Sequence, residues 1–167
     1  VYTAESTDRY FLNASAAVNP STSKHFTGTY TLTTLALSDD FSGDTSTSGS
    51  VSVGGSTTGA LERTGDRDWF AISLQNNSTY QFDLDGSPTN QGTLSDSYIK
   101  IYDISGNEIA SNDNSGSGSN AQLIYKAVNG GTSSGIYYLE ASSGNSGTGT
   151  YKLSARKYGY NLIDGHG

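Results

Sequence analysis

The sequence predicts an all-β fold, an antiparallel β-sandwich, on three observations. Short stretches that alternate apolar and polar residues recur along the chain, separated by Gly, Ser, Asn and Asp, which is the pattern of strands and tight turns. No stretch has the periodicity of a long helix. The composition, with 21 Gly, only 2 Pro and 12 Tyr against 5 Phe, is typical of secreted or surface β-repeats rather than of disordered chains. At 167 residues, the chain can bury a sizeable core.

Each predicted strand places its larger apolar residues on one face, because side chains alternate along a strand. In chain order these faces carry Phe70, Ile72 and Leu74; Tyr80, Phe82 and Leu84; Ile99 and Ile101; Leu123, Tyr125 and Ala127; Tyr137, Leu139 and Ala141; and Tyr151, Leu153 and Ala155. We expect these faces to form one core.

The chain also contains an internal repeat. RYFLNAS at residues 9–15 matches IYYLEAS at 136–142, and TGTYTLT at 27–33 matches TGTYKLS at 148–154. The first copy has the longer loop between its two pieces, as expected if loops vary and strands repeat. We therefore interpret residues 1–36 as the C-terminal hairpin of a preceding repeat or an added hairpin packed on the main unit, 37–157 as a complete unit, and 158–167 as a linker. Neighbouring repeats are then expected partners.

The charge balance indicates which partners to exclude. The formal net charge of -7 argues against nucleic acid and anionic membrane surfaces, and it fits a protein that binds cations. No long apolar run predicts membrane insertion. The chain has no cysteine, which is compatible with an extracellular location in which metal ions replace disulfides.

Catalytic motifs are poorly supported. GTSSG at 131–135 satisfies the G-x-S-x-G pattern, but that motif needs a helix after the strand and none is predicted here. His25 lies in the variable loop of the repeat and His166 near the C-terminus, so neither is placed to serve a serine, and no H-E-x-x-H zinc motif occurs. Paired carboxylates for glycoside hydrolysis stay open on composition alone. We predict that the chain is not an enzyme.

Five stretches together resemble the bacterial pre-peptidase C-terminal (PPC) domain family, in the order in which the family has them. They are DDFSGDTSTSGSVSVGGSTTG (39–59), GDRDWFAISL (65–74), YQFDLDG (80–86), GTLSDSYIKIYDISGNEIASND (92–113) and SGIYYLEASSGNSGTGTYKLS (134–154). This family occurs as a tail on secreted proteases, as tandem repeats in very large bacterial adhesins, and as the collagen-binding module of clostridial collagenases. The resemblance implies a jelly-roll β-sandwich.

The resemblance also implies a calcium site at the entry of the domain. In members of the collagenase type, acids of the entry linker and aspartates of the loop before the aromatic strand share the ion. The corresponding residues are Asp39 and Asp40 in the linker and Asp66 and Asp68 in the loop. The collagenase linker is richer in glutamate and its loop is one residue longer, so the number of oxygen ligands is left open.

The residues themselves are compatible with this site. Ca²⁺ takes six to eight oxygen ligands. Asp66 and Asp68 flank Arg67, so both carboxylates point to the same side of an extended loop, and Asp39, Asp40 or Asp44 could complete the shell. The alternative is an ordinary turn in which arginine already pairs with the aspartates.

A second oxygen-rich loop lies at SNDNSGSGSN, residues 111–120. Its Asn112 and Asp113, with Asp96 from a neighbouring strand, are candidates for a second calcium site. The alternative is a flexible loop with Gly and Asn at turn positions. Asn114 and Asn120 of the same loop are candidates for ligand binding.

Tyrosines on the outward register provide further ligand-binding candidates, namely Tyr98, Tyr102 and Tyr138. The tyrosine-rich strand of collagen-binding members is replaced here by LEASSG at 139–144, which argues against collagen as the ligand.

Together these observations predict a non-catalytic calcium-binding module of a secreted or surface bacterial adhesin. It would bind an extracellular peptide, protein or glycan, or act as a spacer. The alternatives are a C-terminal accessory domain of a secreted peptidase and, from another class, a hydrolase in its own right.

Overall fold

The computed structural model describes residues 13–15, 21–22, 28–32, 38–131 and 133–159. The chain divides into two units, Val1–Ala36 and Leu37–Gly167. In the first unit the described residues form no helix or strand and are exposed. The remaining residues of the predicted N-terminal hairpin, His25 among them, lie outside the described residues. The same holds for His166 and most of the predicted linker at 158–167. The assignment of residues 1–36 to a preceding repeat stays a prediction.

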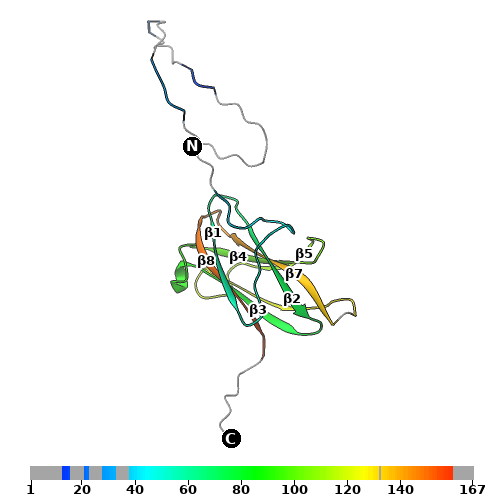
Figure 1. Cartoon of the computed structure of the whole chain (residues 1–167). Coiled ribbons are helices and arrows are strands. Elements are labelled where there is room, and N and C mark those ends of the chain that lie inside the picture. The colour runs from blue at the N-terminus through cyan, green and yellow to red at the C-terminus, as the bar shows by residue number, and fades with distance from the viewer. Residues whose placement is uncertain (1–12, 16–20, 23–27, 33–37, 132, 160–167) are drawn as a thin grey trace. The chain divides into compact units, whose positions relative to one another are not determined.

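The second unit contains eight strands (Figure 1). They are β1 (Ser56–Leu61), β2 (Asp68–Gln75), β3 (Thr79–Asp85), β4 (Ser97–Tyr102), β5 (Glu108–Asn112), β6 (Ala121–Lys126), β7 (Ser134–Ser143) and β8 (Gly149–Lys157). A single 3₁₀ turn, Ser87–Thr89, is the only helical element in the part of the chain that the structure describes. No helix within the described residues is long and apolar enough to span a membrane.

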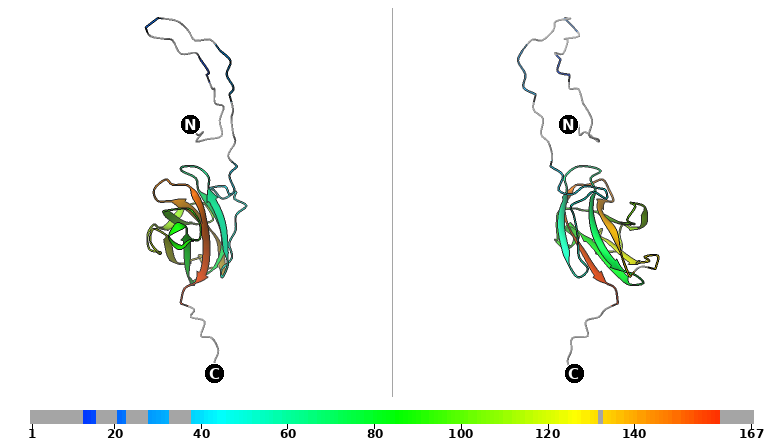
Figure 2. Two further views of the ribbon diagram at one scale, coloured as in Figure 1. Left: turned by 90° about the vertical axis from the view of Figure 1, so that its left-hand side faces the viewer. Right: turned by 45° about the vertical axis from the view of Figure 1, so that its right-hand side comes forward.

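The strands form two four-stranded sheets with the orders β1-β8-β3-β6 and β2-β7-β4-β5. Every pair of neighbours within a sheet is antiparallel. The two layers face one another, as the turned views in Figure 2 show. This is the strand order of a double-sheet jelly roll, so the predicted fold class is confirmed.

The core lies between the two sheets and contains the residues that alternation predicted. Phe70, Phe82 and Leu139 are completely buried, and Tyr151 is 1% exposed. Tyr125 is only partly buried and packs against this core. Burial of these side chains removes apolar area from water and is the main stabilising contribution to the sandwich.

The segment before β1 adds a further edge to the second sheet. Val51 donates its N–H to Ala71 O at 3.1 Å, Ala71 N–H donates to Gly49 O at 2.9 Å, and Ser50 forms a parallel bridge with Ala71. A Cβ at Gly49 would lie 2.5 Å from Trp69 O, so only glycine permits this close approach. We call residues 38–51 the entry segment; it lies along β2, on the side away from β7.

Candidate metal centre

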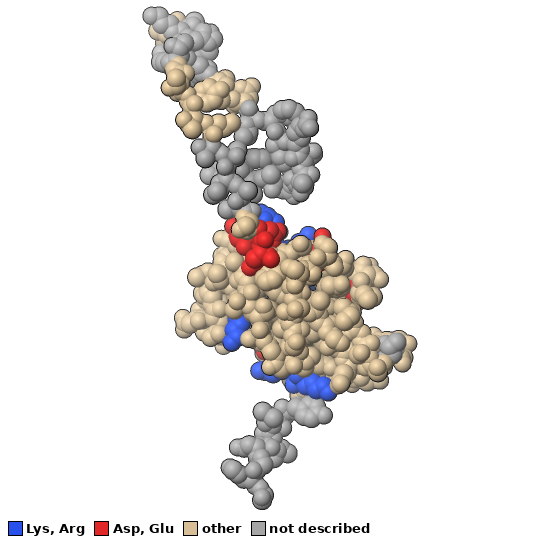
Figure 3. All heavy atoms as spheres, viewed as in Figure 1, with Lys and Arg blue, Asp and Glu red and all other residues tan. Residues whose placement is uncertain are grey.

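Five carboxyl groups meet where the entry segment reaches the turn between β1 and β2. We call them the acidic cluster: Asp39, Asp40, Glu62, Asp66 and Asp68. One ligand oxygen each from Asp39, Asp40 and Asp68 lies within 4.8 Å of the others, and the same holds for Asp39, Glu62 and Asp66. Figure 3 shows acidic side chains gathered at this end of the second unit. The structure therefore brings together the four acids that the sequence predicted at the entry.

Asp68 is the most deeply buried member of the cluster. It is the first residue of β2 and is 0% exposed. Its Oδ2 accepts a hydrogen bond of 2.6 Å from the Tyr151 hydroxyl on β8, in the opposite sheet. Its Oδ1 is buried and accepts no hydrogen bond from the described residues. A buried carboxylate oxygen without a donor is costly, which is the mark of a missing partner.

The surroundings of Asp68 oppose its ionisation. Burial is the main cause that raises its pKa to about 8, opposed by the Tyr151 hydrogen bond and reinforced by the charges of Asp40, Asp66 and Glu62. Burial, followed by the neighbouring Asp68 charge, also raises the pKa of Tyr151. Without a cation to compensate the charge, the surroundings of Asp68 favour its protonated form.

Asp66 is held by a tight turn. It is 4% exposed, and its oxygens accept the N–H of Glu62 at 2.9 Å and of Arg67 at 3.2 Å. Gly65 precedes it with φ +81°, a conformation that favours glycine. Arg63 Nη2 lies 3.1 Å from Asp66 Oδ1 and 3.0 Å from Asp39 Oδ2. The arginine pairing considered as an alternative to a metal is therefore present, and within the acidic cluster it involves only Asp39 and Asp66.

The other three members have no arginine or lysine within ion-pairing distance among the described residues. Asp40 Oδ2 accepts the Ala60 N–H at 3.0 Å, and burial, with the charges of Asp39 and Asp66, raises its pKa. Glu62 Oε2 is buried without a hydrogen bond from the described residues. Burial, then its hydrogen bond with Asp66, raises the pKa of Glu62 to about 7.

Glu62 was missed in the sequence because no motif marks it. It follows β1 directly, four positions before Asp66, and only the reversal of the chain in the turn brings its carboxylate back toward Asp66 and Asp39. The signal that could have found it is an acid that precedes the turn at Gly65, while Asp66 follows that turn.

The donor set decides which cation the cluster suits. Its side-chain ligands are all carboxylate oxygens, a set that hard cations such as Ca²⁺ and Mg²⁺ prefer and that lacks the nitrogen or sulfur ligands typical of zinc. Five carboxyl groups around one guanidinium leave an excess of negative charge that a divalent cation would offset. The residues therefore fit a calcium ion.

Asp44 does not join the acidic cluster. Its Oδ1 accepts hydrogen bonds from Ser46 N at 2.7 Å and Ser46 Oγ at 2.5 Å, and these bonds lower its pKa. It is exposed and closes a local turn of the entry segment. The structure thus gives Asp44 a turn role in place of the predicted ligand role.

Asp96 and Asp113 converge at a second place, over Gly144. A Cβ at Gly144 would lie 2.6 Å from Asp113 Oδ1 and 3.2 Å from both carboxylate oxygens of Asp96. Asp96 Oδ1 and Asp113 Oδ1 are both buried and lack a hydrogen bond from the described residues. Asn112 is oriented toward its own loop, where Oδ1 accepts Ser115 N–H at 3.1 Å. Two of the three predicted residues are thus brought together.

Two predicted ligand-binding residues prove to be buried. Tyr102 is 7% exposed, because its ring stacks on Trp69 at 4.1 Å between centroids and its hydroxyl donates to Glu140 Oε2 at 2.8 Å. Asn120 is 1% exposed; its Oδ1 accepts the Gly86 N–H, and its Nδ2 donates to Asp85 Oδ1. Both predictions require correction: these side chains are already engaged within the fold, which leaves no surface for a ligand.

The remaining three candidates keep exposed surface. Tyr98 and Tyr138 are half-buried on the outer face of the second sheet, with the Lys100 ammonium 5.4 Å from the Tyr98 ring centroid. Asn114 is exposed and donates to Asp113 Oδ2 at 2.9 Å. They lie on separate elements and do not form one constellation with the acidic cluster.

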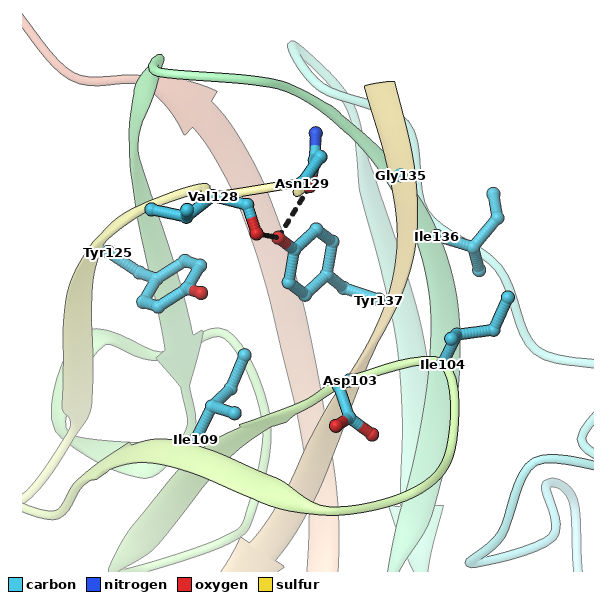
Figure 4. A pocket seen from close by; sticks show the side chains of 9 residues that line it. All are labelled: Asp103, Ile104, Ile109, Tyr125, Val128, Asn129, Gly135, Ile136 and Tyr137. Carbon is cyan, nitrogen blue, oxygen red and sulfur yellow. Dashed lines mark hydrogen bonds between the residues drawn. The ribbon is translucent and has the colours of Figure 1, made fainter. Parts of the chain in front are cut away.

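A hollow of about 430 Å³ opens between β5, β6 and β7 (Figure 4). Sequence reasoning did not find it, because its walls come from three separated segments. Its lining is Asp103, Ile104, Ile109, Tyr125, Val128, Asn129, Gly135, Ile136 and Tyr137. The Tyr137 hydroxyl closes its floor with hydrogen bonds to Asn129 Oδ1 at 2.6 Å and Val128 O at 3.1 Å. It carries no catalytic constellation within the described residues.

Comparison with known proteins gave structural likenesses alone. No family model matches the sequence, and no curated protein matches it. The pre-peptidase C-terminal domain of a collagenase from Bacillus anthracis is similar over 64% of this chain and 92% of its own, with 17% identity and a TM-score of 0.48. PliG from Aeromonas hydrophila, a periplasmic lysozyme inhibitor of g-type lysozyme, is similar over 60% of this chain and 83% of its own, with 14% identity and a TM-score of 0.34.

Proposed function

We propose that this chain is a non-catalytic, calcium-binding β-sandwich module of a secreted or surface-attached bacterial protein. The observation that carries the proposal is Asp68, a fully buried carboxylate of the acidic cluster with one oxygen left without a hydrogen bond from the described residues. Such a group is stable when ionised only if a cation or several donors compensate its charge.

Calcium would add a link between the entry segment and β2, which also share backbone hydrogen bonds at Ser42, Gly49 and Val51. Asp39 and Asp40 belong to the entry segment, whereas Asp68 begins β2. An ion held by all three would fasten the entry segment to the sandwich and would stabilise the folded state by mass action. Extracellular modules commonly bind calcium with dissociation constants of about 10⁻⁴ to 10⁻³ M, which suits a site that is open on one side.

We extend the proposal to a second, weaker cation site at Asp96 and Asp113. Each contributes a buried oxygen without a hydrogen bond from the described residues, and Gly144 leaves the space between them open. With only two carboxylates, most of the shell would be water and backbone carbonyl oxygens.

The biological role that we propose is that of an adhesin module, either a binding module for an extracellular peptide, protein or glycan or a spacer. The hollow beside β5 and β6 and the half-exposed Tyr98 and Tyr138 are surfaces on which a ligand could rest. The alternative, an accessory domain of a secreted peptidase, makes the same metal predictions and differs in what the rest of the gene encodes.

The test is calcium titration by calorimetry together with thermal melts in excess calcium and in chelator. We expect binding heat and a clear rise of the melting temperature. Asp68→Asn should lose most of the rise and keep only the heat of the weaker second site, whereas the matched control Asp44→Asn should keep both. Absence of heat and of a shift in the wild-type protein would overturn the calcium proposal. Peptide and glycan arrays probed in calcium and in chelator then separate a binding module from a spacer.

A further inference from the structure

Strand β7 is paired over most of its length on one side but over only part of it on the other. β2 pairs with residues 134–141 of β7, whereas β4 pairs only with residues 138–143, because β4 ends there and the chain turns away. Figure 4 shows β7 extending beyond this turn, up to Gly135. Within the part of the chain that the structure describes, residues 134–137 therefore have a neighbouring strand on one side only.

The backbone of Ile136 faces this open side. Backbone groups alternate between the two sides of a strand in an antiparallel sheet. Ala71, the β2 partner of Tyr138, gives both its N–H and its C=O to the entry segment, so Tyr138 bonds toward β4. Ile136, two positions earlier, points its N–H and C=O to the same side. Outside the strand ladders, no described residue bonds either group. Ile136 thus offers a donor and an acceptor to a further strand.

Exposed aliphatic side chains gather around the same edge. Ile104, Ile109, Val128 and Ile136 all line the hollow, and their exposure ranges from 40% at Ile109 to 66% at Val128. The volume of the hollow, about 430 Å³, falls within the range of pockets that take small ligands. Concave aliphatic surface that is open to water favours an apolar partner.

The hollow also distinguishes between ligand charges. Of the described residues that line it, Asp103 alone is charged. Asp103 Oδ1 accepts the N–H groups of Ser105 and Asn107 at 2.9 Å each, and Oδ2 accepts Asn107 Nδ2 at 2.9 Å. These bonds, with the Asn107 side chain contributing most, lower the pKa of Asp103 and keep it ionised. A cationic group beside the apolar part of a ligand would complement this charge, whereas an anionic group would be repelled.

We propose that an extended, apolar and basic peptide segment of an extracellular partner protein binds here as an added strand beside residues 134–137. This inference names the ligand of the binding module proposed above and rests on that proposed function. The peptide residue opposite Ile136 would bond its N–H and C=O, and the two adjacent residues would direct their side chains into the hollow. A basic residue would face Asp103. A glycan fits less well, because isoleucine and valine side chains offer no hydrogen bonds to its hydroxyl groups.

The test uses the whole chain and the blocked pentapeptide Lys-Val-Thr-Val-Lys, followed by NMR shifts of the amides. We expect shifts confined to the hollow and its edge, with the Ile136 amide among the largest. A peptide N-methylated at threonine lacks the N–H for Ile136 C=O and should bind about tenfold more weakly. Glu-Val-Thr-Val-Glu should also bind more weakly than the lysine peptide. Asp103→Asn, whose amide oxygen can accept the same turn bonds, should reduce that difference.

Two matched variants locate the site. Ile136→Ser should weaken binding of the lysine peptide, whereas Ile124→Ser should not, because Ile124 is similarly exposed but lies outside the hollow. Binding should be equal in calcium and in chelator, since residues 134–137 lie beside the end of β2 and Asp68 begins it. Failure of the calcium proposal would therefore leave this result unchanged. The inference is wrong if the lysine peptide does not bind, if the N-methylated peptide binds equally well, or if maltotriose shifts the same amides and the peptide does not.

Discussion

The Tyr151 hydroxyl donates a hydrogen bond of 2.6 Å to Asp68 Oδ2 and so connects β8 in one sheet to β2 in the other. Tyr151 thus joins the acidic cluster to the core, because its hydroxyl bonds to Asp68 while its ring packs edge-on against Phe70. The metal site proposed here is thus coupled to the packing of the sandwich.

Asp68→Asn should abolish most of the calcium-induced stabilisation. In excess calcium, at about 100 times the dissociation constant, a native-state ion contributes about 2.7 kcal/mol to the free energy of unfolding. In chelator the variant should be as stable as the wild-type protein or more stable, since an amide removes the repulsion with Asp40 and Glu62. Thermal melts in both conditions measure this. Equal losses with and without calcium would show that Asp68 is structural only.

Tyr151→Phe should destabilise the protein by about 1–3 kcal/mol in chelator, because it leaves both oxygens of buried Asp68 without a donor. Urea unfolding measures the change. Tyr137→Phe is the matched control: it also removes a bonded hydroxyl, but at the hollow, so calcium should raise its stability as much as in the wild-type protein. A calcium response equally reduced in both variants would contradict a local role for Tyr151.

The metal-free protein should lose stability as the pH rises from about 4 to about 8. Between the ordinary pKa of 3.8 and the folded value of about 8, folded Asp68 holds a proton that the unfolded chain has released. Glu62 acts likewise between 4.5 and about 7. Because the folded state binds more protons in this range, its stability falls with rising pH.

Calcium should remove this loss, since it binds the ionised carboxylates and releases the protons. The rise of the melting temperature caused by calcium should therefore be larger at pH 8 than at pH 5. Melts at both pH values, in calcium and in chelator, check the prediction, and a calcium effect independent of pH would contradict it.

Glu140→Gln should destabilise the outer face of the second sheet. Glu140 Oε2 accepts both the Trp69 indole N–H at 2.9 Å and the Tyr102 hydroxyl at 2.8 Å, and bonds to a buried charged group are worth about 1.5–3 kcal/mol each. We expect a loss of about 1–3 kcal/mol with a shift of the tryptophan emission. Glu108→Gln, which removes only the exposed pair with Lys100, should cost less than about 1 kcal/mol.

Gly144→Ala tests the second site. The added methyl group would lie against Asp113 Oδ1 and Asp96 and would fill the space between them. The calorimetric stoichiometry of calcium should fall by one ion, as it should in Asp96→Asn, while the response of the acidic cluster stays. An unchanged stoichiometry in both variants would remove the second site from the proposal.

The sequence predicted what depends on local pattern. Alternation identified the inward-facing residues of the strands, such as Phe70 and Leu139, because every second residue of a half-buried strand is apolar. The acids of the entry segment and of the β1–β2 turn were predicted because a resemblance joined them, and the structure places them together.

What could not be predicted depends on contacts between distant segments. Tyr102 lies on the outer register as expected, but it is covered by Trp69 from β2 and bonded by Glu140 from β7, neither of which is near it in sequence. In the sequence Asn120 looks like an ordinary exposed loop residue, and only the structure shows that it accepts the N–H of the distant Gly86. Glu62 joined the acidic cluster only through the reversal of the chain at Gly65.

The parallel alignment of the entry segment with β2 determines how the module would respond to tension. A pull on residue 38 along β2 would load in shear the hydrogen bonds that Ser42, Gly49 and Val51 form with β2. A cation bound by Asp39, Asp40 and Asp68 would hold the entry segment to β2 close to residue 38, where the force is applied. The module would then be mechanically stiffer in calcium-rich surroundings than in calcium-poor ones, a property that single-molecule pulling on the chain can measure.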